Sequence, residues 1–471
     1  MTPMTKQKTF IEDIERTLYD IKNEDRPLYR TEEGLTEEIV RDISAKKGDP
    51  AWMLDFRLQS LEVNRQTPLP TWGPDLSALD MDHIVTYVQP DARMAGRWED
   101  VPEDIRDTFD RLGIPEAEKS SLAGVGAQYD SEVVYHSVQE SLKKQGVVYT
   151  DMETALREHE AIVREYFMKL VPPKDHKFVA LHGAVWSGGS FVYVPAGVEV
   201  KIPLQSYFRL NAPGAGQFEH TLIIVEPGGS LHFIEGCSAP KYNVTNLHAG
   251  CVELYIKEGA RLRYSTIENW SRNMMNLNTK RALVEKDGLI EWVSGSFGSH
   301  VSMLYPSSIL HGEGARCEFT GVTFAGHGQH LDTGATVVHA APHTSANIST
   351  RSISKDGGVA VYRSAVKVAP DADHARCSVS CESLMLDSNS RADTLPAMDI
   401  QGDEADIGHE AKIGRISDEA IFYLMSRGIK EDEARAMIVR GFVEPIAKAL
   451  PLEYAVEMNN LITIELEGTM G

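Results

Sequence analysis

Hydrophobic and polar residues follow two different periods along the chain, and the changes of period divide it into three regions. From residue 1 to about 176, apolar residues recur at helical spacing, as in segments 52–61, 131–146 and 152–167. Thr36 can cap a helix, because two glutamates and then two apolar residues at i,i+4 spacing follow it. We therefore predict an N-terminal helical region over residues 1–176.

The middle region, residues 177–414, alternates apolar and polar residues in short stretches between turns. Five units consist of a Gly-containing turn followed by an alternating strand: EPGGSLHF, KEGARLRY, EKDGLIEW, GEGARCEF and SKDGGVAVY. The turn glycines Gly228, Gly259, Gly288 and Gly314 are 31, 29 and 26 residues apart. This recurrence predicts a mainly β fold with stacked coils, with a two-sheet sandwich as the alternative. We expect no helix of useful length in this stretch.

The last region, residues 415–471, returns to helical spacing. Ser417 can cap a helix that ends near Gly428, and segments 431–442 and 453–462 continue the pattern. Methionine and aromatic residues are frequent in these helices. They indicate either a packed core or a docking surface for another subunit.

The charge and the ends of the chain narrow the class of protein. The 471 residues carry a formal net charge of −22, which disfavours binding to phosphate backbones or anionic lipids. The first residues lack the apolar core of a signal peptide, and no run of about 18 apolar residues occurs. We therefore expect a cytoplasmic protein that binds neither nucleic acid nor membrane.

Motifs of common enzymes are absent from the sequence. It contains no GxxxxGK[ST], GxGxxG, GxSxG or HExxH, so neither nucleotide cleavage nor standard hydrolysis is indicated. The five cysteines include no CxxC pair, which argues for reduced thiols rather than disulfides or a structural zinc finger.

Two groups of residues could still carry chemistry. Cys377 and Cys381 would share one face of a strand, but about 13 Å apart, so they should act separately. His409 and Glu410 are plausible iron ligands or solvated groups at the junction of strand and helix. A metal site is conceivable among four other histidines and one aspartate, but hydrogen-bonded or surface side chains are favoured: His327, His330, His339, His343 and Asp332.

Specific strings along almost the whole chain resemble the SufB/SufD family of the SUF iron–sulfur cluster assembly system. They are WMLDFRL, AVWSGGSFVYVP, EGCSAP, NTKRAL, GHEAKI, FYLMSRGI and LPLEYAVEM, and the first of them favours the SufB branch. The resemblance implies a right-handed parallel β-helix with helical regions at both ends. It also implies a scaffold rather than an enzyme, which holds a transient iron–sulfur cluster and is driven by the ATPase SufC.

The resemblance also implies partners. These are SufC, docked on the C-terminal helices, SufD or a second copy of the chain, a cysteine desulfurase with its sulfur carrier, and apo-proteins that accept clusters. A reduced flavin belongs to some such complexes, although no flavin motif is legible. The cluster type stays open.

Roles carry over from the family residue by residue. Cys381 matches the sulfur acceptor that helps hold the cluster, Cys237 matches the cysteine linked to sulfur entry, and His409 and Glu410 match two of three Glu-His-Glu ligands. Four further positions match the lining of an internal sulfur route: Arg209, Asn211, Trp270 and Lys280. We expect Arg209 and Lys280 to lower the pKa of a nearby thiol or to form ion pairs.

Two departures and two alternatives remain. Gly408 replaces the first Glu of Glu-His-Glu, so Asp406 or no residue takes its role, and Glu268 stands where some members have Gln.

The alternatives are a purely structural subunit like SufD and a carbohydrate-active β-helix enzyme. The second normally has a signal peptide or a strict hexapeptide repeat, and the sequence shows neither.

Overall fold

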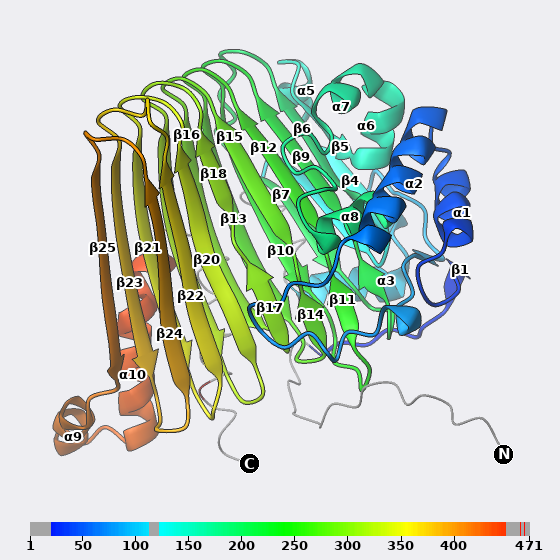
Figure 1. Cartoon of the computed structure of the whole chain (residues 1–471). Helices are drawn as coiled ribbons and strands as arrows, with labels where there is room; N and C mark the ends of the chain where they lie inside the picture. Colours follow the sequence, from blue (N-terminus) through cyan, green and yellow to red (C-terminus); the bar gives the residue numbers. More distant parts are fainter. Residues whose placement is uncertain (1–19, 113–121, 449–461, 463–465, 467–471) are drawn as a thin grey trace.

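Successive coils of the chain pair in parallel, residue for residue. In the computed structural model, which describes residues 20–112, 122–448, 462 and 466, β10 (Ser230–Ser238) pairs with β13 (Arg261–Trp270) and β13 with β16 (Leu289–Gly298) (Figure 1). Gly228 and Gly259 turn the chain at φ 69° and 64° just before β10 and β13. Parallel pairing between coils confirms the predicted β-helix core and rules out the antiparallel sandwich.

Two sheets form the solenoid. The first has ten strands, which run from one end of the solenoid to the other in the order β25 (Asp406–Arg415), β23 (Arg376–Met385), β21 (Ser345–Ser354), β19 (Arg316–Ala325), β16, β13, β10, β7 (Leu204–Arg209), β3 (Gly124–Tyr129) and β4 (Glu132–Val138).

The second sheet has thirteen strands. They are β5 (Val148–Asp151), β6 (Gly189–Val194), β9 (His220–Val225), β12 (Cys251–Ile256), β15 (Thr279–Val284), β18 (Ser307–Leu310), β20 (His330–His339), β17 (Val301–Leu304), β14 (Met274–Asn276), β11 (Asn246–His248), β8 (Gly216–Gln217), β22 (Val359–Val368) and β24 (Arg391–Ile400). A separate pair joins β1 (Pro27–Arg30) to β2 (Val88–Pro90).

Side chains from both sheets fill the interior. Alternate residues of each strand point inward, and aliphatic and aromatic side chains of successive coils stack on one another. Phe233 and Tyr264, register partners on β10 and β13, have stacked rings 5.8 Å apart. The main hydrophobic core therefore lies inside the coils.

Helices cover the N-terminal end of the solenoid (Figure 1). They are α1 (Glu37–Lys47), α2 (Ala51–Gln66), α3 (Glu103–Arg111), α5 (Glu140–Lys143), α6 (Met152–Glu158), α7 (Glu160–Tyr166) and α8 (Lys177–Val185), with 3-10 turns at Met81–His83 and Trp98–Asp100. The predicted helices at 52–61 and 152–167 are confirmed. The hydroxyl of Thr36 accepts the amide of Ile39 at 3.2 Å, so the predicted cap is also confirmed.

Two predictions about this end were wrong. Segment 131–146 is strand β4 followed by the short helix α5, because Asp130, at φ 53°, and Ser131 turn the chain from β3 into a hairpin. The helix α8 interrupts the stretch expected to be free of helices. It is buried on all sides, so its sequence lacks the polar face that reveals a surface helix.

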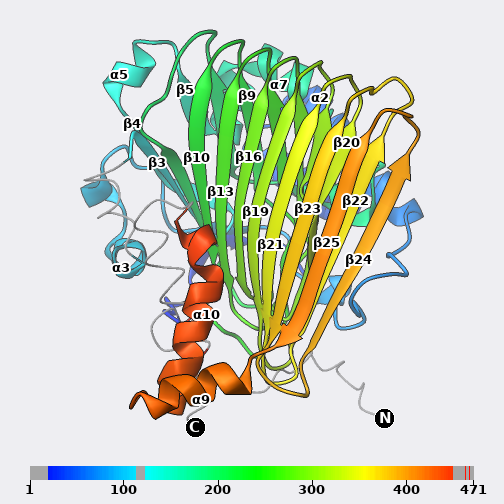
Figure 2. The same cartoon turned by 90° about the vertical axis from the view of Figure 1, so that its left-hand side faces the viewer.

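Among the described residues, no helix or antiparallel strand covers the C-terminal end of the solenoid. The last strands, β24 and β25, expose Leu395, Met398, Ile400 and Ile413 at 43–46 %. The helix α9 (Asp418–Ser426), capped by Ser417 as predicted, leads to α10 (Glu431–Ala447), which packs on the outer face of the ten-stranded sheet (Figure 2). The helix predicted at 453–462 lies, apart from Ile462, outside the described residues.

Within the part of the chain that the structure describes, no helix combines the length and the apolar character that crossing a membrane requires.

Candidate functional site

The last coils bring Cys381 and His409 together. Cys381 lies on the inward face of β23, and its Sγ atom is 3.5 Å from Nε2 of His409 on β25. The hydroxyl of Thr394, on β24, is also 3.5 Å from the sulfur. Cys377 shares the inward face and does not pair with Cys381 in a disulfide, as predicted. The thiol therefore meets its neighbours from adjacent strands.

Burial keeps both members of this pair neutral. Cys381 is 2 % exposed, and its burial raises the pKa of the thiol, with a smaller opposing effect from the Thr394 hydroxyl. Burial lowers the pKa of His409, so its ring is an unprotonated imidazole at neutral pH. A neutral imidazole beside a thiol can accept its proton when a reaction requires the thiolate.

Glu410 is not brought to this pair. It lies on the opposite face of β25, exposed, with its carboxylate 3.0 Å from Nζ of Lys412. Asp406 and Gly408 share this outer face because strand residues alternate. The missing first Glu of the Glu-His-Glu string would therefore lie beside Glu410, not beside Cys381.

A buried ionic network occupies the middle of the solenoid. Nζ of Lys280 lies 3.2 Å from a carboxylate oxygen of Glu235 and 3.1 Å from one of Glu268, and all three side chains are at most 5 % exposed. Burial alone would lower the pKa of Lys280, but the two carboxylates raise it above its ordinary value. The ion-pair role expected for Lys280 is therefore confirmed.

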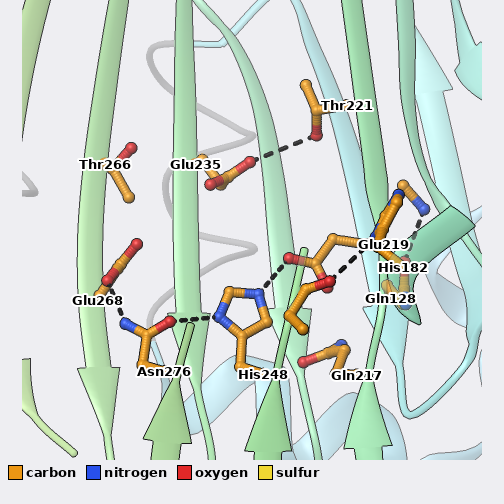
Figure 3. Close-up of polar contacts among 12 residues, drawn as sticks. Gln128, His182, Gln217, Glu219, Thr221, Glu235, His248, Thr266, Glu268 and Asn276 are labelled. Carbon is orange, nitrogen blue, oxygen red and sulfur yellow. Dashed lines mark hydrogen bonds and ion pairs between the residues drawn. The ribbon is translucent and has the colours of Figure 1, made fainter. Parts of the chain in front are cut away.

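From Glu268 the network continues through an amide and an imidazole to a further carboxylate (Figure 3). Glu268 accepts a hydrogen bond from the amide of Asn276 at 2.6 Å, Asn276 contacts His248 at 2.7 Å, and His248 contacts the carboxylate of Glu219. Acidic and basic groups thus alternate along the inside of the sheet.

Cys237 lies beside this network, buried at 1 % exposure on the inner face of β10. Burial raises the pKa of its thiol well above the ordinary value, and Glu235, Glu219 and Glu268 add to the effect. Lys280 opposes this rise but does not overcome it. Lys280 thus lowers the pKa of this thiol as expected, but burial first and the three carboxylates second keep that pKa high.

Of the other three residues matched to the sulfur route, only Trp270 contacts the network. Arg209, fully buried, donates to the hydroxyl of Ser238 at 3.0 Å and to the carbonyl of Ile21 at 2.6 Å. Trp270 packs in one cluster with Cys237, and its ring centroid is 4.6 Å from that of His248. The side chain of Asn211 accepts the amide of Asn23 at 3.1 Å.

Two small cavities link the network to the last coils. Glu268, Lys280 and Asn278 line the first, and both share Ser294, Leu304 and Pro306 in their walls. The second ends at Thr350 and Tyr362. Thr350 is the register partner of Cys381 on the neighbouring strand. Two small cavities therefore lie between Lys280 and Thr350, the residue beside Cys381.

Asp130 holds the backbone next to this network and should make stability depend on pH. Its Oδ1 atom accepts the amides of Asn211 and Ala212 at 2.6 and 2.9 Å, and burial raises its pKa from 3.8 to about 7. Between about pH 4 and pH 7 the folded chain keeps a proton that the unfolded chain loses. Stability should then fall by about 1.4 kcal/mol per pH unit as pH rises.

The substitution Asp130→Asn keeps the acceptor oxygen and tolerates the positive φ, so it should flatten this dependence in urea unfolding at several pH values. Asp100→Asn is the control. A hydrogen bond from Arg97 keeps the pKa of Asp100 below its ordinary value, so that carboxylate stays ionised over the range. An unchanged slope in Asp130→Asn would contradict the interpretation.

The histidines between residues 327 and 343 and Asp332 were predicted to be hydrogen-bonded or at the surface. The structure agrees for three of these side chains. His339 contacts Thr344 at 2.8 Å, His343 stacks on His374, and Asp332 pairs with Arg363 at 2.7 Å. Among the described residues, a different set could hold a metal ion: His182, His220 and Cys251. The sequence carried one signal for it, because His220 and Cys251 are 31 residues apart, one coil of the solenoid.

Comparison with known proteins identifies the class. The model of the SufBD core domain of SUF system FeS cluster assembly matches residues 208–442, and the model of the SufBD N-terminal region matches residues 83–206. These ranges cover the solenoid, the helix α9 and most of α10. The chain belongs to the SufBD family and acts in iron–sulfur cluster assembly by the SUF system.

Relatives within the family are similar over their full length. The iron–sulfur cluster assembly protein SufB of Bacillus subtilis is 51 % identical over 459 residues, 98 % of this chain and 99 % of that protein. A SufBD family protein of Staphylococcus epidermidis is 49 % identical over 99 % of this chain and 100 % of its own length. These matches support the SufB branch and leave no support for a carbohydrate-active enzyme.

Proposed function

We propose that this chain is the scaffold on which the SUF system builds iron–sulfur clusters, with Cys381 as sulfur acceptor and cluster ligand. The observation that carries the proposal is the 3.5 Å contact between Cys381 and His409 at the open end of the solenoid. Thiolate is the usual ligand of iron in such clusters, and imidazole binds iron more weakly. A pair of one thiolate and one imidazole therefore suits a cluster that is later transferred, because the imidazole releases iron more easily.

Sulfur transfer at this pair is a thiol–persulfide exchange. The Cys381 thiol gives its proton to His409, and the thiolate attacks the outer sulfur of a carrier persulfide. The S–S bond of the carrier breaks, the carrier leaves as a thiolate, and Cys381 becomes the persulfide. Reduction to sulfide needs two electrons, for which a reduced flavin in the complex is the proposed donor. The iron and sulfide are substrates, and the finished cluster is cargo for apo-proteins.

The internal network offers a longer route for the same sulfur, in which Cys237 accepts it before Cys381 does. We infer that Cys237 receives it near Arg209, Asn211 and Trp270, and that the two cavities beyond Lys280 lead toward Cys381. Because burial keeps Cys237 protonated, its thiol needs a rearrangement of the complex before it can react. ATP binding by SufC would supply such a rearrangement.

Two protein ligands are too few for a cluster, which takes four. We propose that a SufD subunit or a second copy of the chain supplies further ligands across the open end. The exposed side chains of Leu395, Met398 and Ile413 on the last strands support contact there. Glu410, on the outer face, would then be a ligand only after this contact rearranges the last strand.

Anaerobic reconstitution tests the scaffold function against the alternative of a purely structural subunit. With ferrous iron, a persulfide donor, a reductant such as a reduced flavin and the partner subunits, a scaffold acquires the visible absorption of an iron–sulfur cluster with matching iron and sulfide. A purely structural subunit stays colourless under the same conditions.

The helix α9 presents the surface that we propose for the ATPase SufC. Phe422, Tyr423 and Met425 are 72 %, 56 % and 43 % exposed, an apolar set that water disfavours. Replacing Phe422 by alanine should weaken SufC binding by about 2 kcal/mol, roughly thirtyfold in Kd, as expected for an aromatic hot spot. Isothermal titration of SufC into the chain would measure this change.

Leu28→Ala is the matched control for Phe422, because Leu28 is 65 % exposed at the other end of the chain. Its SufC affinity should equal that of the unmodified chain. Equal losses in both variants would argue against α9 as the docking surface.

A further inference from the structure

A second set of metal-binding side chains lies outside the solenoid, beneath the helix α8. His220 and Cys251 are register partners on β9 and β12, so their side chains lie next to each other on the outer face of the thirteen-stranded sheet. His182, in the last turn of α8, lies over them. Their ligand atoms are all within 4.8 Å of one another, and the three residues are at most 1 % exposed.

The outer nitrogen of His182 has a hydrogen-bond partner, because its Nδ1 lies 2.9 Å from the carbonyl oxygen of Ala249. The outer nitrogen of His220, Nε2, lies 3.2 Å from a carboxylate oxygen of Glu253 without a hydrogen bond to it. The inner nitrogens, Nε2 of His182 and Nδ1 of His220, lie 3.0 Å from each other. A carbonyl partner like that of His182 is typical of metal-binding histidines.

Glu253 is itself fixed in place. Its carboxylate accepts the backbone amides of Met168, Leu170 and Val171 at 2.5, 2.8 and 2.8 Å, and its side chain is fully buried. It lies two residues after Cys251 on the same face of β12. The carboxylate is thus a rigid support behind His220.

We propose that His182 Nε2, His220 Nδ1 and Cys251 Sγ bind a zinc ion or a similar divalent transition metal. Two imidazoles and one thiolate are ligands that zinc prefers, and a water molecule commonly completes such a three-ligand site.

A hydrogen-bonded histidine pair without an ion is the competing interpretation. In that case one proton lies between the two inner nitrogens, whereas a metal would replace this proton and draw the thiolate toward it. The metal would tie α8 to strands from two successive coils. Its role would be to fix the N-terminal helices on the solenoid, separate from the chemistry at Cys381.

Metal analysis of the intact chain tests the proposal. Because the site is closed to solvent, the ion has to enter during folding, so the protein is produced in zinc-supplemented medium and then washed with a chelator. Mass spectrometry of the metal content should find one zinc per chain. The Cys381→Ala variant should retain that zinc, since it removes only the proposed cluster ligand. Loss of cluster assembly would therefore be distinguishable from loss of the zinc site.

Cys251→Ser should lower the zinc content at least tenfold, whereas Cys317→Ser should not. Cys317 is the matched control because it is also a free, buried cysteine. If Cys251→Ser does not fold, X-ray absorption at the zinc edge of the unmodified chain still shows which atoms bind the zinc. One sulfur at about 2.3 Å and two nitrogens at about 2.0 Å support the site. Zinc-free protein, or zinc without a sulfur ligand, overturns it.

Discussion

Replacing Cys381 by alanine should reduce cluster formation in the complete complex to background. The substitution removes the sulfur that faces His409 at 3.5 Å, and the remaining imidazole cannot accept a persulfide sulfur or hold a cluster alone. The measurement is anaerobic reconstitution with SufC and SufD present, followed by visible absorption and by iron and sulfide analysis. Both the final acceptance of sulfur and the binding of the cluster use this thiol, so we expect a large effect.

Cys377→Ala is the control for this experiment. Cys377 lies on the same strand and the same inward face, is also free and is 3 % exposed. Both substitutions remove one buried sulfur, so their costs in stability should be similar, and thermal unfolding can verify this. Cluster formation should survive in Cys377→Ala. Undiminished clusters in Cys381→Ala would show that sulfur and iron are held elsewhere.

Replacing Lys280 by methionine should lower the free energy of unfolding by about 3–5 kcal/mol, because the change leaves two buried carboxylates without their cation. Glu235 and Glu268 are 1 % and 2 % exposed on their side chains, so water cannot take the place of the ammonium group. Urea unfolding followed by circular dichroism would measure the loss. Addition of Glu268→Gln should restore part of the stability, since it removes one of the two stranded charges.

A partly exposed ion pair provides the comparison. Lys257 and Glu285 lie 2.9 Å apart with side chains 20 % and 34 % exposed, so Lys257→Met should cost no more than about 1 kcal/mol. Similar losses in the two lysine variants would mean that the interior network is better hydrated than the buried contacts indicate.

The sequence predicted the fold where its local signals were strong. The turn glycines and the alternation in units such as KEGARLRY identified stacked coils, and Thr36 and Ser417 marked the starts of helices correctly. It failed where burial removed the signal. The helix α8 has no polar face, and β4 owes its form to a two-residue hairpin that a helical reading of 131–146 overlooks.

The candidate site was predictable only in part. Cys381 and His409 were expected together, and the solenoid explains why: they lie on paired strands although 28 residues separate them. The separation of Glu410 from them also follows from strand alternation. The carboxylates that raise the pKa of Cys237 could not be foreseen, because Glu219, Glu235 and Glu268 meet only through the register of three coils.

The two ends of the solenoid differ, and this difference limits how chains can pair through their strand edges. Antiparallel strands and helices cover the first coil, whereas β24 and β25 have one strand partner each among the described residues. Among the described residues, strand pairing through the solenoid is therefore available at one end only. If two such chains paired there, the described part of the pair would offer no further uncovered sheet edge, so strand pairing would give a closed pair and not a fibre.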